Sequence, residues 1–205
     1  MQDVPMSETL ALEPISDYGV AKAAATQFCL KETLFNKLPV YTIRPFSVYG
    51  DYEMPSRLIP TIMTSTILGE PIQLSSPHFM RDYIYIKDMV RLYRVVAQVR
   101  PHDAYIFNGG TGVQSSIQDV VSTVQELSGK TFNVAWGAST PRPWEPRAWK
   151  ADVTRAQNVL GWQPAYDVHD GLKMTLEWFE KNLLLYAPKS AAVVSLASQG
   201  SSWIR

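Results

Sequence analysis

The sequence predicts an α/β protein built around parallel strands, and three observations carry this prediction. Stretches with helical period alternate along the chain with short β-branched runs, which is the pattern of strands joined by helical crossovers. Several of the short runs end in turns rich in glycine, proline and serine. The 205 residues suffice for one domain with a real core, or for a domain and a half. In such folds the loops at the carboxyl ends of the strands carry the chemistry.

The first two elements have clear local signals. Residues 16–35 are rich in alanine and have a helical pattern, with Ser16 or Asp17 as the expected N-cap. The run VYTIRP at 40–45 is typical of a short strand that ends at Pro45. A helix followed by a strand and then by a Gly/Pro/Ser loop is the rhythm of a parallel sheet.

The rest of the chain continues the alternation. A helix is expected from about Ser56 to Gly69, although Pro60 limits its first turn. Residues 1–14 and 187–205 lack helical or strand period, so we expect a leading loop and a disordered tail. The other expected elements are strands at 71–75 and 81–86, a helix at 87–99, a strand at 104–108, a serine-capped helix at 115–129, a strand at 132–136, and helices at 152–161 and 168–184.

Composition excludes several classes of protein. Lysine plus arginine equals aspartate plus glutamate at 19 each, so no global field favours nucleic acid or a membrane surface. Cys29 is the only cysteine, and His78, His102 and His169 lie far apart without an acidic or cysteine companion at ligand spacing, so we expect neither a disulfide nor a metal site. No apolar run reaches the ~18 residues of a membrane span and the amino terminus lacks a signal peptide, so a soluble, cytoplasmic protein is expected.

The stretch SDYGVAK raises the question of whether Tyr18 is reactive. On a helix Tyr18 and Lys22 share one face, with Cβ atoms about 6 Å apart. An ammonium at that distance favours a phenolate, so the pair could donate and accept protons near neutral pH. Tyr83 and Lys87 repeat the spacing, but in a strand they would lie about 13 Å apart. The alternative is that Tyr18 only packs its helix against a sheet.

Four collinear stretches resemble one known family. They are YGVAK at 18–22, RPFSVYG at 44–50, RDYIYIKDMV at 81–90, and PRPWEPRAWKADVTRAQNVLGW at 141–162 with the closing LEWF. Together they resemble the extended short-chain dehydrogenase/reductase superfamily, specifically the NAD-dependent epimerase/dehydratases that act on nucleotide sugars. The resemblance covers about residues 10–182.

The resemblance implies a catalytic pair and a cofactor, NAD or NADP. Tyr18 would be the catalytic acid/base, and Lys22 would lower the pKa of Tyr18 and bond the nicotinamide ribose. Chemistry agrees, because a hydride leaves a sugar carbon only while its hydroxyl loses a proton, so one group must both accept and donate. The segment expected against the nicotinamide, with backbone near the carboxamide, consists of Pro45, Phe46, Ser47 and Val48.

The resemblance also implies a site for the diphosphate and ribose of a nucleotide-diphosphate sugar. Guanidinium groups grip a diphosphate well. Arg57 and Arg81 map onto family residues near the nucleotide, and Arg142 and Glu145 onto a pair that binds phosphate and ribose. The alternatives are that Arg81 only caps a strand and that Arg142 and Glu145 form a solvated loop pair.

Three further features are interpreted as structural. We expect Asp82 and Asp88 to hold loops. The NGGTG run beginning at Asn108 resembles a turn of the second domain, with glycines that supply positive φ. It does not match a cofactor loop, because Ser115 stands where a third glycine would be.

The cofactor-binding start of the family fold is not found. The chain has no GxGxxG or GxxGxxG motif, and residues 1–15 offer only Ser7 and Thr9, in a loop, as candidates for the family's catalytic serine or threonine. We therefore expect the carboxyl-terminal part of a Rossmann-like enzyme, without its first three or more βα units, on the order of 100 residues. Such a chain alone would bind NAD(P) weakly.

The expected organisation is a remnant of the cofactor domain at 1–50, a mainly substrate-binding α/β region at 51–186 with interleaved Rossmann elements, and the tail. The expected activity is that of an epimerase or 4,6-dehydratase that transiently oxidises the sugar at C4. The alternatives are a 4-keto-sugar nucleotide reductase and a non-catalytic remnant that binds a nucleotide sugar. The helices at 16–35 and 88–99 would suit a homodimer contact, although the same faces would suit a core.

Overall fold

The computed structural model describes residues 4–98, 105–138 and 148–186 of the chain. The predicted tail at 187–205 lies outside these residues. The elements in chain order are α1 (Asp17–Asn36), β1 (Thr42–Pro45), β2 (Ser47–Tyr49), α2 (Leu58–Leu68), β3 (Ile72–Leu74), β4 (Met80–Arg81), β5 (Tyr83–Tyr85), α3 (Ile86–Gln98), β6 (Ile106–Gly109), β7 (Ser115–Ser116), α4 (Ile117–Ser128), β8 (Val134–Trp136), α5 (Thr154–Leu160), α6 (Val168–Asn182) and the 3-10 turn η1 (Leu183–Leu185).

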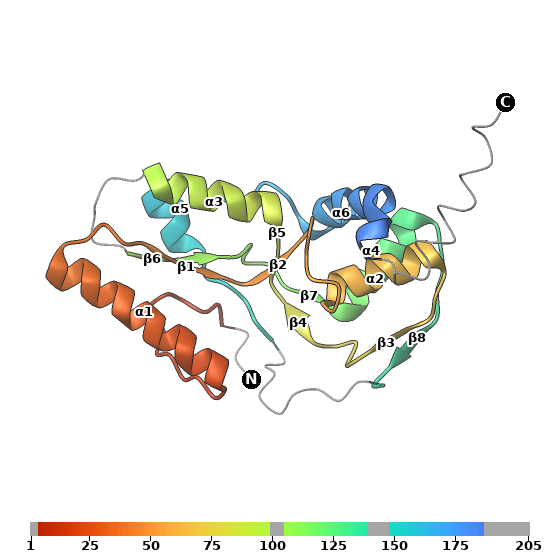
Figure 1. Cartoon of the computed structure of the whole chain (residues 1–205), viewed down its shortest axis with the longest axis horizontal. Helices are drawn as coiled ribbons and strands as arrows, with labels where there is room; N and C mark the ends of the chain where they lie inside the picture. The colour runs from red at the N-terminus through yellow and green to blue at the C-terminus, as the bar shows by residue number, and fades with distance from the viewer. Residues whose placement is uncertain (1–3, 99–104, 139–147, 187–205) are drawn as a thin grey trace, which may run out of the picture.

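The first unit is a parallel pair of strands with helices on both faces. β1 and β6 pair in the register Thr42↔Ile106 to Pro45↔Gly109. Figure 1 shows α1 on one face of this pair and α3 and α5 on the other. The buried apolar side chains of this unit form one cluster, which consists of Ile84, Met89, Leu92, Val96, Phe107, Ala156 and Trp162.

The helix α1 begins as the sequence predicts but buries little. The Ser16 side chain caps it by accepting a hydrogen bond from the Gly19 N–H at 3.1 Å. Thr33, the only buried residue of α1, donates its hydroxyl to the Val40 carbonyl at 3.0 Å and so ties the end of the helix to the chain that enters β1.

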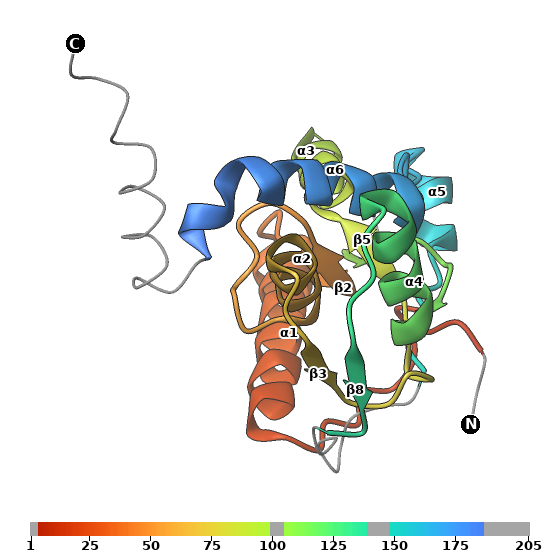
Figure 2. The same cartoon turned by 90° about the vertical axis from the view of Figure 1, so that its right-hand side faces the viewer.

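The second unit consists of α2, α4 and α6 with the parallel ribbon β3–β8. Figure 2 shows α6 lying across α2 and α4, with the ribbon below them. Ser116 and Asp119 form a reciprocal capping box that starts α4. The buried core contains Tyr49, Ile59, Ile62, Met63, Ile72, Leu74, Tyr83, Tyr85, Ile117, Val120, Val121, Val124, Leu172, Leu176 and Phe179.

The parallel pair β2–β5 joins the two units. Side chains alternate along a strand, so Tyr83 and Tyr85 enter the core of the second unit while Ile84 enters that of the first. The prediction that a Gly/Pro/Ser loop directly follows the strand ending at Pro45 was wrong, because Ser47–Tyr49 is a strand. This three-residue strand is stabilised by pairing with β5 rather than by a pattern of its own.

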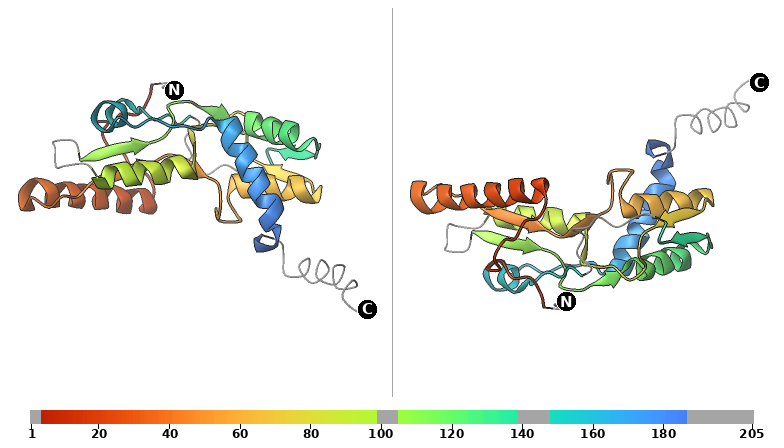
Figure 3. Two further views of the ribbon diagram at one scale, coloured as in Figure 1. Left: turned by 90° about the horizontal axis from the view of Figure 1, so that it is seen from above. Right: turned by 90° about the horizontal axis from the view of Figure 1, so that it is seen from below.

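The parallel α/β character of the chain is confirmed, but the strands within the described ranges form four separate pairs rather than one sheet. β4 and β7 pair antiparallel, and the sequence did not predict β7. Figure 3 shows the two units end to end, with α1 at one end and α2 and α4 at the other. The two units interleave in sequence, because four elements that lie between α2 and α6 in the chain are not among the helices and ribbon of the second unit: β5, α3, β6 and α5. The predicted domain boundaries stay predictions.

None of the helices in the described ranges has both the length and the apolar character that a bilayer crossing requires.

Candidate active site

Tyr18 and Lys22 lie together at the start of α1. The Lys22 Nζ atom is 5.5 Å from the centroid of the Tyr18 ring, so the predicted shared face is confirmed. The Tyr18 ring is 74% exposed. The alternative that this tyrosine merely packs the helix against the sheet is therefore wrong, and the phenol and ammonium are both open to a ligand.

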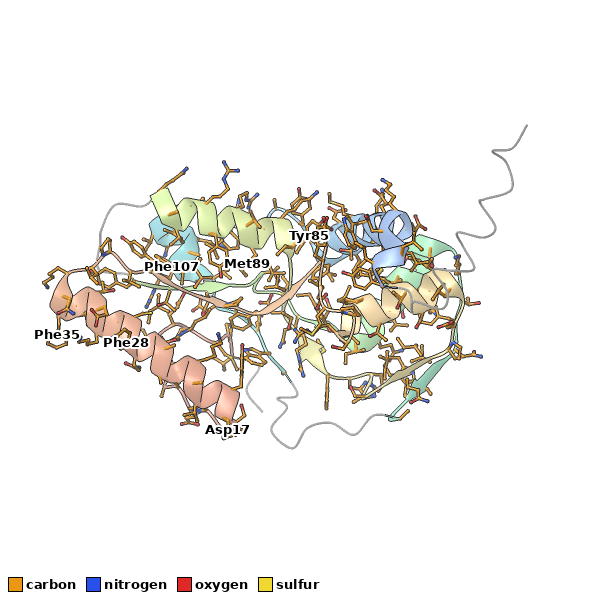
Figure 4. All side chains as sticks on the ribbon, viewed as in Figure 1. Asp17, Phe28, Phe35, Tyr85, Met89 and Phe107 are labelled. Carbon is orange, nitrogen blue, oxygen red and sulfur yellow. The ribbon has the colours of Figure 1, made fainter. Side chains whose placement is uncertain are left out.

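Tyr18 and Lys22 lie toward the end of the first unit at which the parallel strand β1 has its carboxyl end. Asp17, the neighbour of Tyr18, marks the end of α1 nearer the second unit, and Phe35 marks the far end (Figure 4). β1 runs the opposite way to α1, so its carboxyl end and the start of α1 lie toward the same end of the unit (Figure 1). Ligands of parallel α/β folds bind at this edge.

The segment predicted to lie against a nicotinamide is a fixed piece of backbone. Pro45 is exposed and ends β1, and Ser47 and Val48 belong to β2. The N–H of Phe46 donates to Gly109 O at 2.9 Å, and that of Ser47 to Asp82 O at 3.0 Å. Strand-type hydrogen bonds thus hold the chain on both sides of this segment.

The predicted substrate arginines lie on other elements. Arg81 is half-buried in β4, with its guanidinium over the Phe79 ring at 5.6 Å and a hydrogen bond from Nη1 to Met80 O at 2.8 Å. Arg57 is exposed at the N-cap position of α2, which begins at Leu58, two residues later than the predicted start at about Ser56. Arg142 and Glu145 lie outside the described residues.

Asp82 anchors two other segments beside this edge. Its carboxylate is fully buried and accepts hydrogen bonds from Thr111 N and Oγ1, both at 2.7 Å, from Gly112 N at 2.9 Å and from Ala151 N at 3.0 Å. The prediction that Asp82 holds loops is confirmed.

The prediction for Asp88 is confirmed in the same way. This buried carboxylate accepts from Ala165 N and Tyr166 N at 3.0 Å and pairs with Arg91 at 3.2 Å. It holds the segment between α5 and α6 against α3.

The glycines of NGGTG serve two purposes. Gly112 has a φ of +75°, as predicted, but Gly109 and Gly110 do not have positive φ, so the prediction was wrong there. A Cβ on Gly110 would lie 2.5 Å from the Cβ of Ala151, so close packing requires that glycine. Asn108 also belongs to β6 of the first unit rather than to a second-domain turn.

Glu8 is a buried residue that the sequence reasoning missed. Its carboxylate accepts from Asn108 N at 2.9 Å and lies 3.6 Å from Arg155 Nε, and its carbonyl accepts from Arg44 Nη1 at 3.1 Å. Burial lowers the pKa of Arg44, opposed by the charge of Glu8. No local pattern marks Glu8, because Asn108 lies 100 residues further along the chain.

Glu53 is a second buried residue that sequence reasoning missed, because its loop is held by Tyr186, which lies far along the chain. Burial raises the pKa of its carboxyl to about 7, against the opposing effect of Arg57. Its Oε2 atom is buried and has no hydrogen-bond partner among the described residues.

One group of described side chains has metal-ligand spacing. The ligand atoms of Asp167, His169 and Asp170 all lie within 4.8 Å of one another, so the expectation that no histidine has an acidic companion was wrong at His169. All three residues are exposed, and Asp167 already caps α6 by accepting from Asp170 N. These features suit a solvated helix start.

Comparison with known proteins gives a consistent picture. The family model described as GDP-mannose 4,6 dehydratase matches residues 1–175. A dTDP-glucose 4,6-dehydratase of Xanthomonas campestris is 28% identical over 186 residues, which cover 86% of this chain and 52% of that protein. The chain thus spans about half the length of the curated relatives it matches.

Solved structures resemble the chain closely. MoeE5 in complex with UDP-glucuronic acid and NAD matches with a TM-score of 0.81 and 32% identity, over 88% of this chain and 61% of that one. A UDP-glucose 4-epimerase of Thermotoga maritima with UDP-glucose matches with a TM-score of 0.81 and 28% identity, over 89% and 59%.

Proposed function

Because this chain belongs to the GDP-mannose 4,6-dehydratase family, among the NAD-dependent epimerases and dehydratases of the extended short-chain dehydrogenase/reductases, we propose that it takes part in the 4,6-dehydration or 4-epimerisation of a nucleotide sugar. The observation that carries the proposal is the exposed Tyr18–Lys22 pair at the capped start of α1. The names of the relatives favour dehydratase and epimerase over the alternative of a reductase.

In this proposal Tyr18 moves the proton. Its phenolate oxygen accepts the proton of the sugar hydroxyl and later returns it, and the ammonium of Lys22 stabilises the anionic form. Bound NAD or NADP would supply the hydride acceptor and donor. The exposure of both side chains leaves room for a sugar against them.

The described residues fit one end of such a cofactor. Lys22 would bond the nicotinamide ribose, and the fixed backbone at 46–48 would contact the carboxamide. The printed sequence has no glycine-rich turn for the pyrophosphate. We therefore expect this chain by itself to bind NAD(P) weakly.

A nucleotide-diphosphate sugar is the proposed substrate, and the UDP sugars in the titles of the neighbouring structures support this class. Arg57 and Arg81 would hold the diphosphate. Arg142 and Glu145 are proposed on the sequence alone. Comparison of UDP-glucose, UDP-glucuronic acid and dTDP-glucose tests which base and which sugar the site accepts.

The test measures turnover. Wild-type chain is incubated with NAD and with UDP-glucose, UDP-glucuronic acid or dTDP-glucose, and products are separated by chromatography. Removing a general acid/base costs about 10²- to 10⁴-fold in rate, so Tyr18→Phe should lose most turnover. Tyr93→Phe is the matched control, because Tyr93 is exposed on α3, on the other face of β1–β6.

The outcomes separate the alternatives. Equal turnover by wild type and Tyr18→Phe contradicts the proposed role of the phenol. A wild-type chain that binds a sugar nucleotide in calorimetry but shows no turnover favours the non-catalytic remnant.

We also propose a cytoplasmic homodimer. The exposed side of α1 carries an apolar stripe, defined here as Ala24, Phe28 and Phe35, whose two phenylalanines are 64% and 77% exposed. Between the two phenylalanines, Lys31 lies with its ammonium 5.8 Å from the centroid of the Phe28 ring and pairs with Glu32. Exposed aromatic side chains with charged neighbours on one helix face are typical of a contact between subunits.

A further inference from the structure

In the loop at 50–57, the Glu53 carboxylate is turned into the protein and lies beside Arg57, which is predicted to bind the substrate. Gly50 has a φ of 136° and Tyr52 a φ of 61°, so two residues with positive φ bend the chain after β2. The Glu53 side chain is only 14% exposed, and the Arg57 side chain, four residues later, is 62% exposed.

The C-terminal end of the second unit fixes this loop. The Tyr186 hydroxyl donates to the Glu53 carbonyl at 2.8 Å. The Tyr52 ring packs edge-on against Trp178, with centroids 4.9 Å apart. The backbone of Glu53 is therefore anchored, and its carboxylate has little freedom to reach water.

The carboxylate has one cationic partner among the described residues. Glu53 Oε1 lies 3.4 Å from Arg57 Nε, while Oε2 is buried and accepts no hydrogen bond from any residue that the structure describes. A buried carboxylate with an unsatisfied oxygen is costly when ionised. The ion pair with Arg57 offsets part of that cost, which makes the ionisation of Glu53 depend on what else Arg57 binds.

We propose that Glu53 is a proton-linked partner of Arg57, which releases this guanidinium to an anionic ligand, the diphosphate of a nucleotide sugar, by taking up a proton. The inference rests on the proposed function, because it deepens the role of Arg57 in the same site. An anion on Arg57 weakens its attraction for the Glu53 carboxylate and adds a negative charge nearby. Both effects favour protonated Glu53.

The linkage has a definite sign. Burial raises the pKa of free Glu53 to about 7, and a bound anion raises it further, so binding takes up protons between about pH 7 and the higher value. Affinity for the anion therefore falls as pH rises through this window.

Among the residues that the structure describes, no group that acts on the pKa of Glu53 would reverse this sign. Burial raises the pKa of Tyr186, so its phenol stays neutral in the window. The charged or titratable groups of this loop and of the residues packed against it are Asp51, Tyr52, Arg57 and Tyr186.

The test is calorimetric binding of UDP-glucose, whose phosphates are both esterified and do not titrate near neutrality. For wild type we expect affinity to be about 3- to 10-fold weaker at roughly pH 8.5 than at roughly pH 6. In buffers of different ionisation enthalpy, binding near pH 7 should show net proton uptake. Glu53→Gln should bind without proton uptake and with equal affinity at both pH values.

Two further variants sharpen the result. Glu70→Gln, at an exposed site, is the matched control and should keep the wild-type pH dependence. Arg57→Ala should weaken binding and abolish the proton uptake. Wild-type binding that is independent of pH overturns the role of Glu53 and leaves the proposed function unaffected. No binding of any of the three sugar nucleotides overturns the substrate class of the proposed function and the inference with it.

Discussion

At the scale of single residues, Asp82 connects more of the molecule than any local pattern shows. Its buried carboxylate accepts four hydrogen bonds, three from groups in the NGGTG turn and one from the N–H of Ala151. All four partner groups are therefore donors. We expect Asp82→Asn to lower the free energy of unfolding by about 3 kcal/mol, because an amide removes the charge and places N–H donors against donors. Urea unfolding followed by circular dichroism measures the change.

The control for Asp82 is an exposed carboxylate. Asp170→Asn, on the solvated first turn of α6, should change the free energy of unfolding by less than about 0.5 kcal/mol. Equal losses in the two variants would show that the anchoring role is wrong.

Sequence reasoning at this scale succeeded where partners are near in sequence. Tyr18 and Lys22 could be paired from helical spacing alone, and Asp82 and Asp88 could be recognised as loop anchors from their motif. Glu8 and Glu53 could not, since burial of a carboxylate depends on segments that arrive from elsewhere in the chain. The roles of Arg57 and Arg81 in binding stay predictions.

At the scale of elements, the contact between α6 and β2 depends on a missing side chain. Gly171 lies inside α6, and a Cβ there would fall on the hydroxyl of Tyr49. Gly→Ala within a helix ordinarily stabilises by about 1 kcal/mol. We expect Gly171→Ala to destabilise instead, by about 1–2 kcal/mol, because overpacking outweighs propensity.

A double-mutant cycle tests this reversal. Tyr49→Phe removes the hydroxyl and its 3.3 Å hydrogen bond to Val168 O, so it costs stability by itself. In that background Gly171→Ala should cost less than in wild type, giving a coupling of about 0.5–1.5 kcal/mol from urea unfolding. Additive effects would contradict the proposed clash.

The loop before α2 predicts a pH-dependent stability. The pKa of Glu53 rises from its usual 4.5 to about 7 on folding. Folded protein therefore holds this proton more tightly, so the stabilisation is present below pH 4.5 and is lost as pH rises through about 7. We expect wild type to lose about 2–3 kcal/mol more than Glu53→Gln between these limits.

Urea unfolding of both proteins at about pH 5 and about pH 8 measures this difference. The other carboxylates contribute the same slope to wild type and variant, so subtraction isolates Glu53. Parallel pH profiles for the two proteins would rule out a buried, protonated Glu53.

Helices were easier to predict from sequence than strands. Ser16, Ser116 and the glycine after α2 mark helix ends through local hydrogen bonds and backbone geometry, and the structure places caps there. β2 and β7 are three and two residues long and depend on partner strands, so no local period could predict them.

At the scale of the whole molecule, the two units are unequally covered. The second unit packs three helices around one core, whereas α1 in the first unit buries only Thr33. The sequence predicted the alternation and the parallel pairing. It left open whether the face of the alanine-rich helix at 16–35 would be a subunit contact or part of a core, because periodicity shows which residues share a face and not what covers that face.

The apolar stripe of α1 predicts self-association. Ala24, Phe28 and Phe35 are spaced by four and seven residues, so they share one face of the helix. In a twofold dimer each stripe would face its copy, and buried phenylalanines would carry much of the binding energy. We expect wild type to sediment as a dimer, and the double variant Phe28→Lys/Phe35→Lys as a monomer, with dimer affinity weakened by about 30-fold or more.

The matched control places the same charges on another exposed apolar pair. Leu184 and Leu185 of η1 are 57% and 60% exposed, so Leu184→Lys/Leu185→Lys should leave the dimer intact. Circular dichroism should show unchanged helix content in both double variants, because the replaced side chains lie outside the cores. A wild-type chain that sediments as a monomer at all concentrations tested, or a dimer that the phenylalanine variant leaves unaffected, would show that the stripe is not the contact between subunits.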